Sequence, residues 1–191
     1  MKKNLKIAFS GLDGSGKSTQ VQRIKKVLEE KGYSVKVQQH FALPIGKVCE
    51  KIIKLSKDPY IRALTFALDE YAQKLDNMTD LKYDIILCDR SHYCAYAYLV
   101  AQGVEYDWIE NIYKFSEIYD LCIYLDISVE TSYLHKAADD ISPRISDEQL
   151  LKVRDMYLTL VQNDKMVRVN AEQDVHKVTE DILELINKEL G

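Results

Sequence analysis

Short apolar runs alternate along the chain with segments whose apolar residues recur every three or four positions. We expect a strand at each of the runs, which lie at residues 6–10, 34–40, 83–88, 119–125 and 166–170. The third run, Tyr83–Cys88, is apolar on both faces near its end, which is typical of a buried parallel strand. The pattern therefore predicts a sheet that is covered on both faces.

The segments between these runs have the spacing of amphipathic helices. The first begins at Ser18 and ends at Gly32, a residue type that favours helix termination. Asp58 and Pro59 are the residue types expected at the cap and the first position of a later helix. Further helices are expected at residues 45–56, 59–77, 93–102, 107–116, 129–137 and 147–162, and Val175, Val178, Ile182 and Leu185 mark a closing helix. Alternating strands and helices predict an α/β fold, in which a five-stranded, mainly parallel sheet has helices on both faces in one domain spanning residues 1–191.

Composition narrows the possible functions. Hydrophobic residues make up 47% of the chain and charged residues 29%, as in ordinary globular proteins. The formal net charge of −4 argues against a dedicated nucleic-acid-binding protein. The longest apolar run, Ala95–Ala101, is far shorter than the roughly 20 residues that cross a bilayer. The N-terminus lacks the apolar segment of a signal peptide, and the four cysteines form no CxxC pair, so we expect a cytoplasmic protein with reduced thiols.

The sequence Gly-Leu-Asp-Gly-Ser-Gly-Lys-Ser-Thr at residues 11–19 matches the phosphate-binding loop pattern G-x-x-x-x-G-K-[ST]. Its glycines allow successive backbone N–H groups to surround a phosphate, and the N-terminus of the following helix attracts the same anion. We expect Lys17 to reach the β- and γ-phosphates and the Ser18 hydroxyl to bind Mg²⁺. The predicted ATP-binding residues in the loop are Gly11, Asp13, Gly14, Ser15, Gly16, Lys17, Ser18 and Thr19.

Asp89 and Arg90 follow the third predicted strand. The carboxyl ends of parallel strands line the ligand crevice of an open α/β sheet. An acid at this place suits the organisation of Mg²⁺, and the planar fork of arginine suits a phosphate. Asp126 ends the fourth predicted strand in the same way, and we interpret it as a helix cap or as a further site residue.

Residues 11–19, the pair Asp89-Arg90 and the segment Tyr124-Leu125-Asp126 before a helix together resemble the thymidylate kinase family of nucleoside monophosphate kinases. The similarity covers essentially the whole chain. It implies a three-layer P-loop kinase fold with a lid at about residues 135–146, in which Lys136 and Arg144 would contact the ATP phosphates. It also implies Mg²⁺-dependent transfer of a phosphoryl group from ATP to dTMP or a related nucleoside monophosphate, by an enzyme that forms a homodimer.

The resemblance also implies roles for the residues on the acceptor side. Asp13 would approach the acceptor sugar, and Arg90 would lie at the acceptor phosphate. Phe66, in Leu64-Thr65-Phe66, would stack on the base, with Tyr98 beside the sugar and base. The implied catalytic group is Lys17, Asp89, Arg90 and Asp13.

Several positions depart from the family pattern. Glu70 stands where the family has an arginine that contacts the base, and a carboxylate there favours a base with N–H donors, such as cytosine, guanine or adenine. Residues 39–44 lack the family's Arg-x-Pro, so one contact to the acceptor phosphate is expected to be lost. The lid region offers His135, Lys136 and Arg144 rather than several arginines, which predicts weaker stabilisation of the transferring phosphoryl group.

Two alternatives follow from these departures. Asp89-Arg90-Ser91 also resembles the acid-Arg-Ser triplet of deoxynucleoside kinases, whose neutral acceptors need fewer phosphate contacts. The loop residue Asp13 favours the monophosphate kinase instead. The second alternative is a nucleotide-binding paralogue with weak catalysis, which the missing arginines would explain.

Overall fold

The five predicted strands form one sheet in which all neighbouring strands are parallel. The structure, a computed structural model, describes residues 4–79, 82–135 and 146–191. The strands are β1 (Leu5–Gly11), β2 (Val35–Gln39), β3 (Ile85–Asp89), β4 (Leu121–Asp126) and β5 (Val167–Asn170), in the spatial order β2-β3-β1-β4-β5. The predicted α/β fold is confirmed, with a sheet that is parallel throughout.

The helices of the described ranges begin and end close to the predicted positions. They are α1 (Lys17–Glu30), α2 (Pro44–Leu55), α3 (Pro59–Thr79), α4 (His92–Val100), α5 (Tyr106–Tyr113), α6 (Val129–His135), α7 (Asp147–Gln162) and α8 (Val175–Leu190). Local signals explain several of these ends. The Asp58 carboxylate accepts a hydrogen bond from Ile61 N at 2.9 Å at the start of α3, and Gly32 has a φ of +89° just beyond α1.

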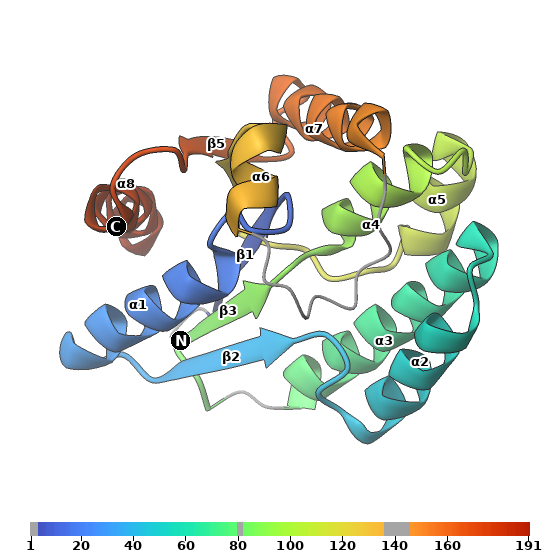
Figure 1. Cartoon of the computed structure of the whole chain (residues 1–191). Coiled ribbons are helices and arrows are strands. Elements are labelled where there is room, and N and C mark those ends of the chain that lie inside the picture. Colours follow the sequence, from blue (N-terminus) through green and yellow to red (C-terminus); the bar gives the residue numbers. More distant parts are fainter. Residues whose placement is uncertain (1–3, 80–81, 136–145) are drawn as a thin grey trace.

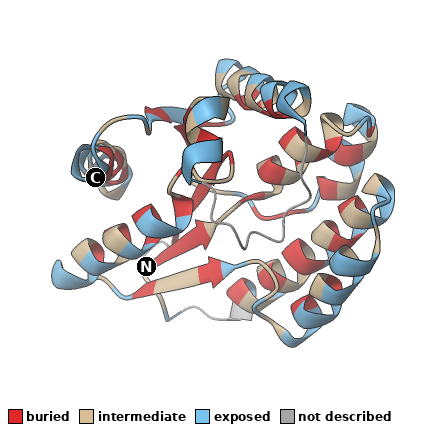
Figure 2. Ribbon diagram, in the orientation of Figure 1, coloured by how far each residue is buried: buried red, intermediate tan, exposed pale blue. Residues whose placement is uncertain are grey.

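The sheet separates two hydrophobic cores, because successive side chains of a strand point to opposite faces. On one face Ile7 and Phe9 of β1 pack against the inward sides of α1 and α8. On the other face Ala8 and Tyr124 pack beneath α4 and α7, and the rings of Tyr124 and Tyr157 stack at 4.8 Å. Helix α3 packs on α4, and α2 packs on α3, so these helices extend the second layer past the sheet (Figure 1). The central strands are buried, whereas the helices expose their outward faces (Figure 2).

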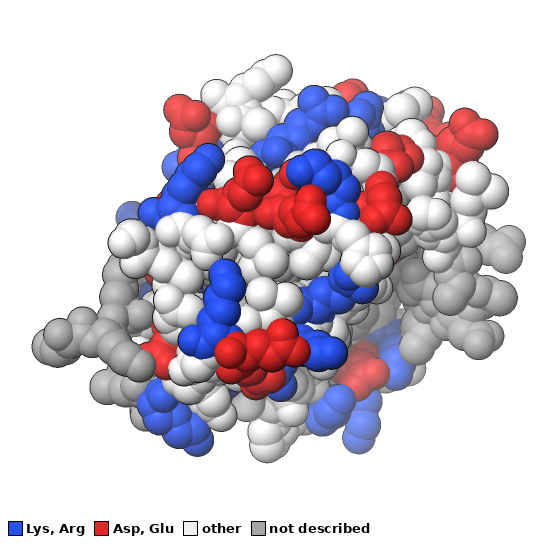
Figure 3. All heavy atoms as spheres, turned by 90° about the vertical axis from the view of Figure 1, so that its left-hand side faces the viewer, with Lys and Arg blue, Asp and Glu red and all other residues white. Residues whose placement is uncertain are grey.

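The face formed by α1 and α8 carries basic and acidic side chains interspersed (Figure 3). Lys25–Glu29 and Lys26–Glu30 are ion pairs one turn apart on α1, and Lys177–Asp181 is a similar pair on α8. This face shows no field of one sign, in agreement with the mixed overall charge. Within the ranges that the structure describes, no helix has the length and apolar character to cross a membrane.

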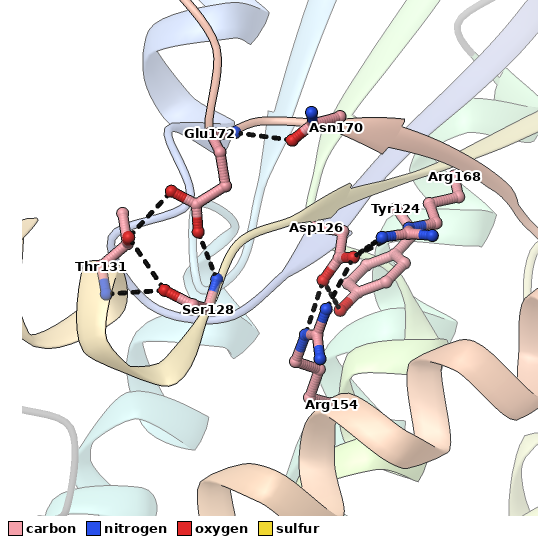
Figure 4. Close-up of polar contacts among 8 residues, drawn as sticks. All are labelled: Tyr124, Asp126, Ser128, Thr131, Arg154, Arg168, Asn170 and Glu172. Carbon is pink, nitrogen blue, oxygen red and sulfur yellow. Dashed lines mark hydrogen bonds and ion pairs between the residues drawn. The ribbon is translucent and has the colours of Figure 1, made fainter.

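Asp126 joins three elements at the end of β4 (Figure 4). Its side chain is buried, and both carboxylate oxygens accept hydrogen bonds from Arg154 of α7, at 2.9 and 3.1 Å. Arg168 of β5 donates to Oδ2 at 2.8 Å, and the Tyr124 hydroxyl donates to Oδ1 at 2.7 Å. The cap of α6 is instead Ser128, whose Oγ accepts a hydrogen bond from Thr131 N at 3.0 Å. The interpretation of Asp126 as a helix cap is therefore wrong, because its oxygens are occupied by the arginines and Tyr124.

We expect the substitution Asp126→Asn to lower the free energy of unfolding by about 2 kcal/mol, the range for charged hydrogen bonds when the partners are partly exposed. Burial alone would raise the pKa of Asp126, but the hydrogen bonds from Arg154 and Tyr124 hold it below its ordinary value. A depressed pKa in the folded state stabilises the protein above the unfolded-state pKa, and this stabilisation is lost as the pH falls. Urea denaturation should therefore show a difference between wild type and variant at pH 7 that shrinks below about pH 4.

The matched control is Glu148→Gln, which removes a carboxylate from the exposed pair with Lys152 on α7. It should leave the denaturation midpoint unchanged. An Asp126→Asn variant as stable as the wild type at pH 7 would contradict the role assigned to this cluster.

Candidate active site

The phosphate-binding loop connects the end of β1 to the start of α1, as the sequence predicts. Gly11 has a φ of +150°, and a Cβ there would lie 2.6 Å from the carbonyl oxygen of Leu125. Gly14 has a φ of +81°, and its Cβ would lie 2.9 Å from the carbonyl oxygen of Ser132 on α6. Both positions therefore need glycine for the backbone conformation and for close packing against β4 and α6.

Lys17 occupies the centre of the loop with only 5% of its surface exposed. Its Nζ donates hydrogen bonds to the carbonyl oxygens of Gly11 at 3.1 Å and Leu12 at 2.7 Å. Burial and the nearby positive charge of Arg90 lower the pKa of Lys17 to about 8. These hydrogen bonds hold the ammonium group in place. Because burial and Arg90 both disfavour its positive charge, a bound polyanion would stabilise that charge.

Ser18 and Asp89 meet across the ends of β1 and β3. Ser18 Oγ donates a hydrogen bond to Asp89 Oδ2 at 2.6 Å. Ser18 and Thr19 are exposed in the first turn of α1, whereas Ser15 is buried in the loop. The structure thus places a hydroxyl and a carboxylate beside the predicted phosphate site.

Arg90 and Asp13 form an ion pair between the two loops, with Nη2 3.1 Å from Oδ1. The Tyr98 hydroxyl of α4 accepts a hydrogen bond from the Asp13 backbone N–H at 3.2 Å. On the other side of the loop, Ser132 Oγ donates to the Asp13 carbonyl oxygen at 2.6 Å. Arg90 has a φ of +97°, an unfavourable conformation for a residue with a side chain, and strain of this kind clusters at functional sites.

A cavity of about 790 Å³, called here the central cavity, extends from the Arg90–Asp13 pair to the interior side of α3. Its lining includes all five residues predicted to bind an acceptor: Asp13, Phe66, Glu70, Arg90 and Tyr98. A nucleotide-sized ligand suits this volume, because small-molecule sites usually measure a few hundred to about a thousand Å³. The structure therefore brings together residues from four separate segments of the chain.

The cavity also contains residues that sequence reasoning missed. Phe41 lies beside Phe66, with ring centroids 5.5 Å apart and planes at 30°. The Arg62 guanidinium lies 6.0 Å from the Phe66 centroid, and together with Lys54 and Lys57 it lines the α2–α3 side of the cavity. Lysine and arginine side chains therefore reach the cavity from α2, α3 and the segment between them, although residues 39–44 contain neither residue type. Arg62 could have been found, since it lies one helical turn before Phe66 on the same face of α3.

Three ionisable groups gather at the inner end of the central cavity. Glu70 is 2% exposed, and burial raises the pKa of its carboxyl to about 7. His40 bonds through Nδ1 to Asp69 Oδ2 at 2.9 Å, and its Nε2 lies 3.9 Å from Glu70 Oε1. Burial alone would lower the pKa of His40, but the hydrogen bond to Asp69 and the charge of Glu70 raise it. Glu70 thus faces a basic group that is not its neighbour in sequence.

The predicted lid begins where α6 ends. His135, the last residue of α6, lies with its ring Nδ1 3.2 Å from the Gly14 carbonyl oxygen. The predicted phosphate contacts Lys136 and Arg144 lie outside the described residues. Helix α7 then begins at Asp147 behind a capping box formed by Ser146 and Gln149.

Comparison with known proteins agrees with this geometry. The protein-family model described as thymidylate kinase matches residues 9–182. The chain belongs to the thymidylate kinase family. A probable thymidylate kinase 1 of Saccharolobus solfataricus is 31% identical to it over 188 residues, covering 96% of this chain and 97% of that protein. Probable thymidylate kinases of Pyrococcus abyssi and Methanosphaera stadtmanae are 34% and 32% identical, and both alignments cover 96% of this chain.

Membership of the thymidylate kinase family confirms the expected P-loop kinase fold and the expected enzyme class, a nucleoside monophosphate kinase. The matched residues include the phosphate-binding loop from Gly11 onward, Asp89-Arg90 and both sides of the predicted lid. The comparisons do not favour the deoxynucleoside kinase or the paralogue with weak catalysis. The roles of individual residues stay predictions.

We expect kcat/KM for ATP to fall above about pH 8, approaching tenfold per pH unit, because kcat/KM reports the pKa values of the free enzyme. The pKa of Lys17 is lowered to about 8, so the side chain is charged below that pH and neutral above it. A neutral Lys17 no longer attracts the polyphosphate. The measurement is initial rate against ATP concentration from pH 6.5 to 9.5, at an acceptor concentration well below saturation.

Lys17→Arg provides the control, since its guanidinium stays charged throughout this range. Its residual activity should show no decline near pH 8. A wild-type profile that stays flat to pH 9.5 would contradict the prediction.

Proposed function

We propose that the chain transfers the γ-phosphoryl group of ATP to dTMP, with ATP in the loop of residues 11–19 and dTMP in the central cavity. The observation that carries this proposal is the continuity of the two sites. The lining of the cavity includes Asp13, which belongs to the phosphate-binding loop, as well as Phe66 and Glu70 of α3. The names of the related proteins, probable thymidylate kinases, support dTMP as the acceptor.

On the donor side, the loop N–H groups and the Lys17 ammonium would hold the β- and γ-phosphates. Ser18 Oγ and the Asp89 carboxylate are oxygen donors of the kind that Mg²⁺ prefers, and they are 2.6 Å apart. Among the described side chains, no three His, Cys, Asp or Glu gather into a metal site. When bound, Mg²⁺ would neutralise charge on the phosphates.

On the acceptor side, Arg90 would bind the dTMP phosphate. Asp13 already holds the guanidinium at 3.1 Å, so the fork is oriented before the acceptor enters. The ring of Phe66 would stack on the base, and the Tyr98 hydroxyl would lie beside the sugar. The protein's task is to bring acceptor and γ-phosphate together and to neutralise their charge, which is the larger part of catalysis in phosphoryl transfer.

The lid would complete the site over the donor. Its predicted cations, Lys136 and Arg144, lie between α6 and α7 in the sequence. Closure of such a segment excludes water from the transferring phosphoryl group. At the end of α6, Ser132 Oγ and His135 Nδ1 lie 2.6 and 3.2 Å from backbone oxygens of the phosphate-binding loop, which supports this proposal.

The enzyme would act as a homodimer through α2 and α3. Exposed apolar side chains recur at spacings of three, four and seven residues on each helix, as on the seam of a helix pair. They are Ile45, Val48, Ile52 and Leu55 on α2 and Ile61, Leu64, Leu68, Leu75 and Met78 on α3. An apolar stripe that is exposed to solvent along two neighbouring helices is typical of a protein–protein interface.

A reducing compartment, and hence a cytoplasmic location, suits the cysteines. Cys49, Cys88, Cys94 and Cys122 are all free and buried. Free thiols of this kind are typical of proteins in the cytosol. ATP and nucleoside monophosphates are available there as well.

The function is tested by coupled ADP release with Mg·ATP and a panel of deoxynucleoside monophosphates, ribonucleoside monophosphates and free nucleosides. We expect dTMP to be the best acceptor. In the Arg90→Lys variant, kcat/KM for dTMP should fall by about 100-fold, because lysine cannot replace the planar fork. Preference for a free nucleoside, or no turnover of any monophosphate, would overturn the proposal.

The dimer is tested by sedimentation of the double variant Leu64→Glu/Leu68→Glu. Two charges in the apolar stripe of α3 should convert a dimer into a monomer, since unpaired charges are costly in an interface. The control is Ile118→Glu, which changes an equally apolar side chain that is 83% exposed elsewhere on the surface. A wild-type monomer at micromolar concentration would contradict the proposed interface.

A further inference from the structure

The inner end of the central cavity presents one imidazole nitrogen and one carboxyl oxygen to a ligand. His40 Nε2 and Glu70 Oε1 are 3.9 Å apart, which is too far for a hydrogen bond between them. Both residues line the cavity. Among the described residues, the hydrogen bonds of these two side chains are made by His40 Nδ1 and Glu70 Oε2, whereas Nε2 and Oε1 form only this long ion pair, and both side chains are largely buried.

Hydrogen bonds to other residues of the protein hold both side chains in place. Asp69 Oδ2 accepts hydrogen bonds from His40 Nδ1 at 2.9 Å, from Phe41 N at 3.1 Å and from Gln73 Nε2 at 2.6 Å. The Tyr119 hydroxyl donates to Glu70 Oε2 at 3.3 Å. The atoms left over for a ligand are therefore His40 Nε2 and Glu70 Oε1.

The chemical character of the two atoms follows from these contacts. The Asp69 carboxylate can only accept, so His40 Nδ1 donates to it and the protonated ring presents a second donor at Nε2. The hydrogen bond to Asp69 and the charge of Glu70 favour this protonated ring against the effect of burial. Glu70 Oε1 accepts a hydrogen bond as a carboxylate, and a neutral carboxyl group also keeps an acceptor oxygen.

We propose that His40 and Glu70 together recognise the ring edge of the thymine base, His40 Nε2–H donating to O4 and Glu70 Oε1 accepting from N3–H. This inference rests on the proposed function, because it concerns the base of the nucleotide acceptor. Thymine carries a donor, N3–H, and an acceptor, O4, side by side, and the two protein atoms, 3.9 Å apart, offer the complementary acceptor and donor. The rings of Phe41 and Phe66 supply the adjacent stacking surface.

The pair discriminates against cytosine in the same orientation. Cytosine has a lone pair at N3 and an amino group at position 4, so the lone pair would face the Glu70 oxygen and the amino group would face the His40 donor. Both contacts are repulsive, and burial prevents water from relieving them. Uracil has the same edge as thymine, so this pair does not distinguish dTMP from dUMP.

The test compares wild type with Glu70→Met, which keeps a similar volume and removes the acceptor. We expect kcat/KM for dTMP to fall about 10- to 100-fold, mainly through KM, because N3–H is left buried without a partner. The ratio of kcat/KM for dTMP to that for dCMP should fall with it. The inhibition constant of 2-deoxyribose 5-phosphate, which has no base, should not change. Glu70→Gln, which keeps an acceptor oxygen, should recover most of the activity with dTMP.

His40→Leu should give the same pattern as Glu70→Met, since it removes the donor to O4. The matched control is Glu117→Gln, which alters another buried carboxylate, bonded to Lys6 at 2.7 Å and absent from the cavity lining. This variant should keep the wild-type ratio between dTMP and dCMP. Thermal melting of every variant identifies effects that come from the fold alone.

Three results would overturn the inference. The first is a wild-type preference for dCMP over dTMP. The second is a Glu70→Met variant that keeps the wild-type ratio between these acceptors. The third is a rise in the inhibition constant of 2-deoxyribose 5-phosphate that equals the loss with dTMP. If the wild type phosphorylates no monophosphate at all, the proposed function itself fails, and that outcome is distinct from these three.

Discussion

The site depends on the register in which β1 pairs with β3. Phe9 stands opposite Asp89 in this parallel pair, and the Arg90 backbone N–H donates to the Phe9 carbonyl oxygen at 3.1 Å. This register brings the loop after β1 and the loop after β3 to the same edge of the sheet, so that Asp89 meets Ser18 and Arg90 meets Asp13. A slip of one residue would send every side chain of β3 to the opposite face, and the cores on both faces forbid it. The packing of the cores therefore specifies the geometry of the site.

Burial has a second consequence at this edge of the sheet. It lowers the pKa of Lys17 to about 8 and raises the pKa of Glu70 to about 7, since a charge is poorly solvated at both positions. The cations of the site have fixed partners. Lys17 donates to loop carbonyls, Arg90 to Asp13, and His40 to Asp69. The side chains that would contact a negatively charged or hydrogen-bonding ligand are therefore already oriented. The entropy cost of ordering them is included in the free energy of folding and does not reduce the affinity for the ligand.

The parts of the site that the sequence predicts are those with local causes. The loop at residues 11–19 is continuous in sequence, and Asp89-Arg90 stands at the end of an apolar run, so both could be located without a structure. His40 could not be placed in the same way, because it stands in the loop after β2 and lies beside Glu70 of α3 only in the folded structure. The helix-cap interpretation of Asp126 is wrong for a related reason. Its position after a strand is a local signal, but the arginines that bind it come from α7 and β5.

The family pattern has a basic residue where this chain has Glu70. The position of His40 offers a physical explanation for this difference. Considered alone, a carboxylate in place of the family's arginine removes a hydrogen-bond donor and favours a different base. The structure supplies a donor from another element, since the ring of His40 lies beside Glu70 and is held there by Asp69. In the proposed site the two groups together would offer the base one donor and one acceptor, whereas a guanidinium offers donors alone. Sequence comparison at a single position cannot detect such a pairing, because Glu70 stands on α3 and His40 in the loop after β2.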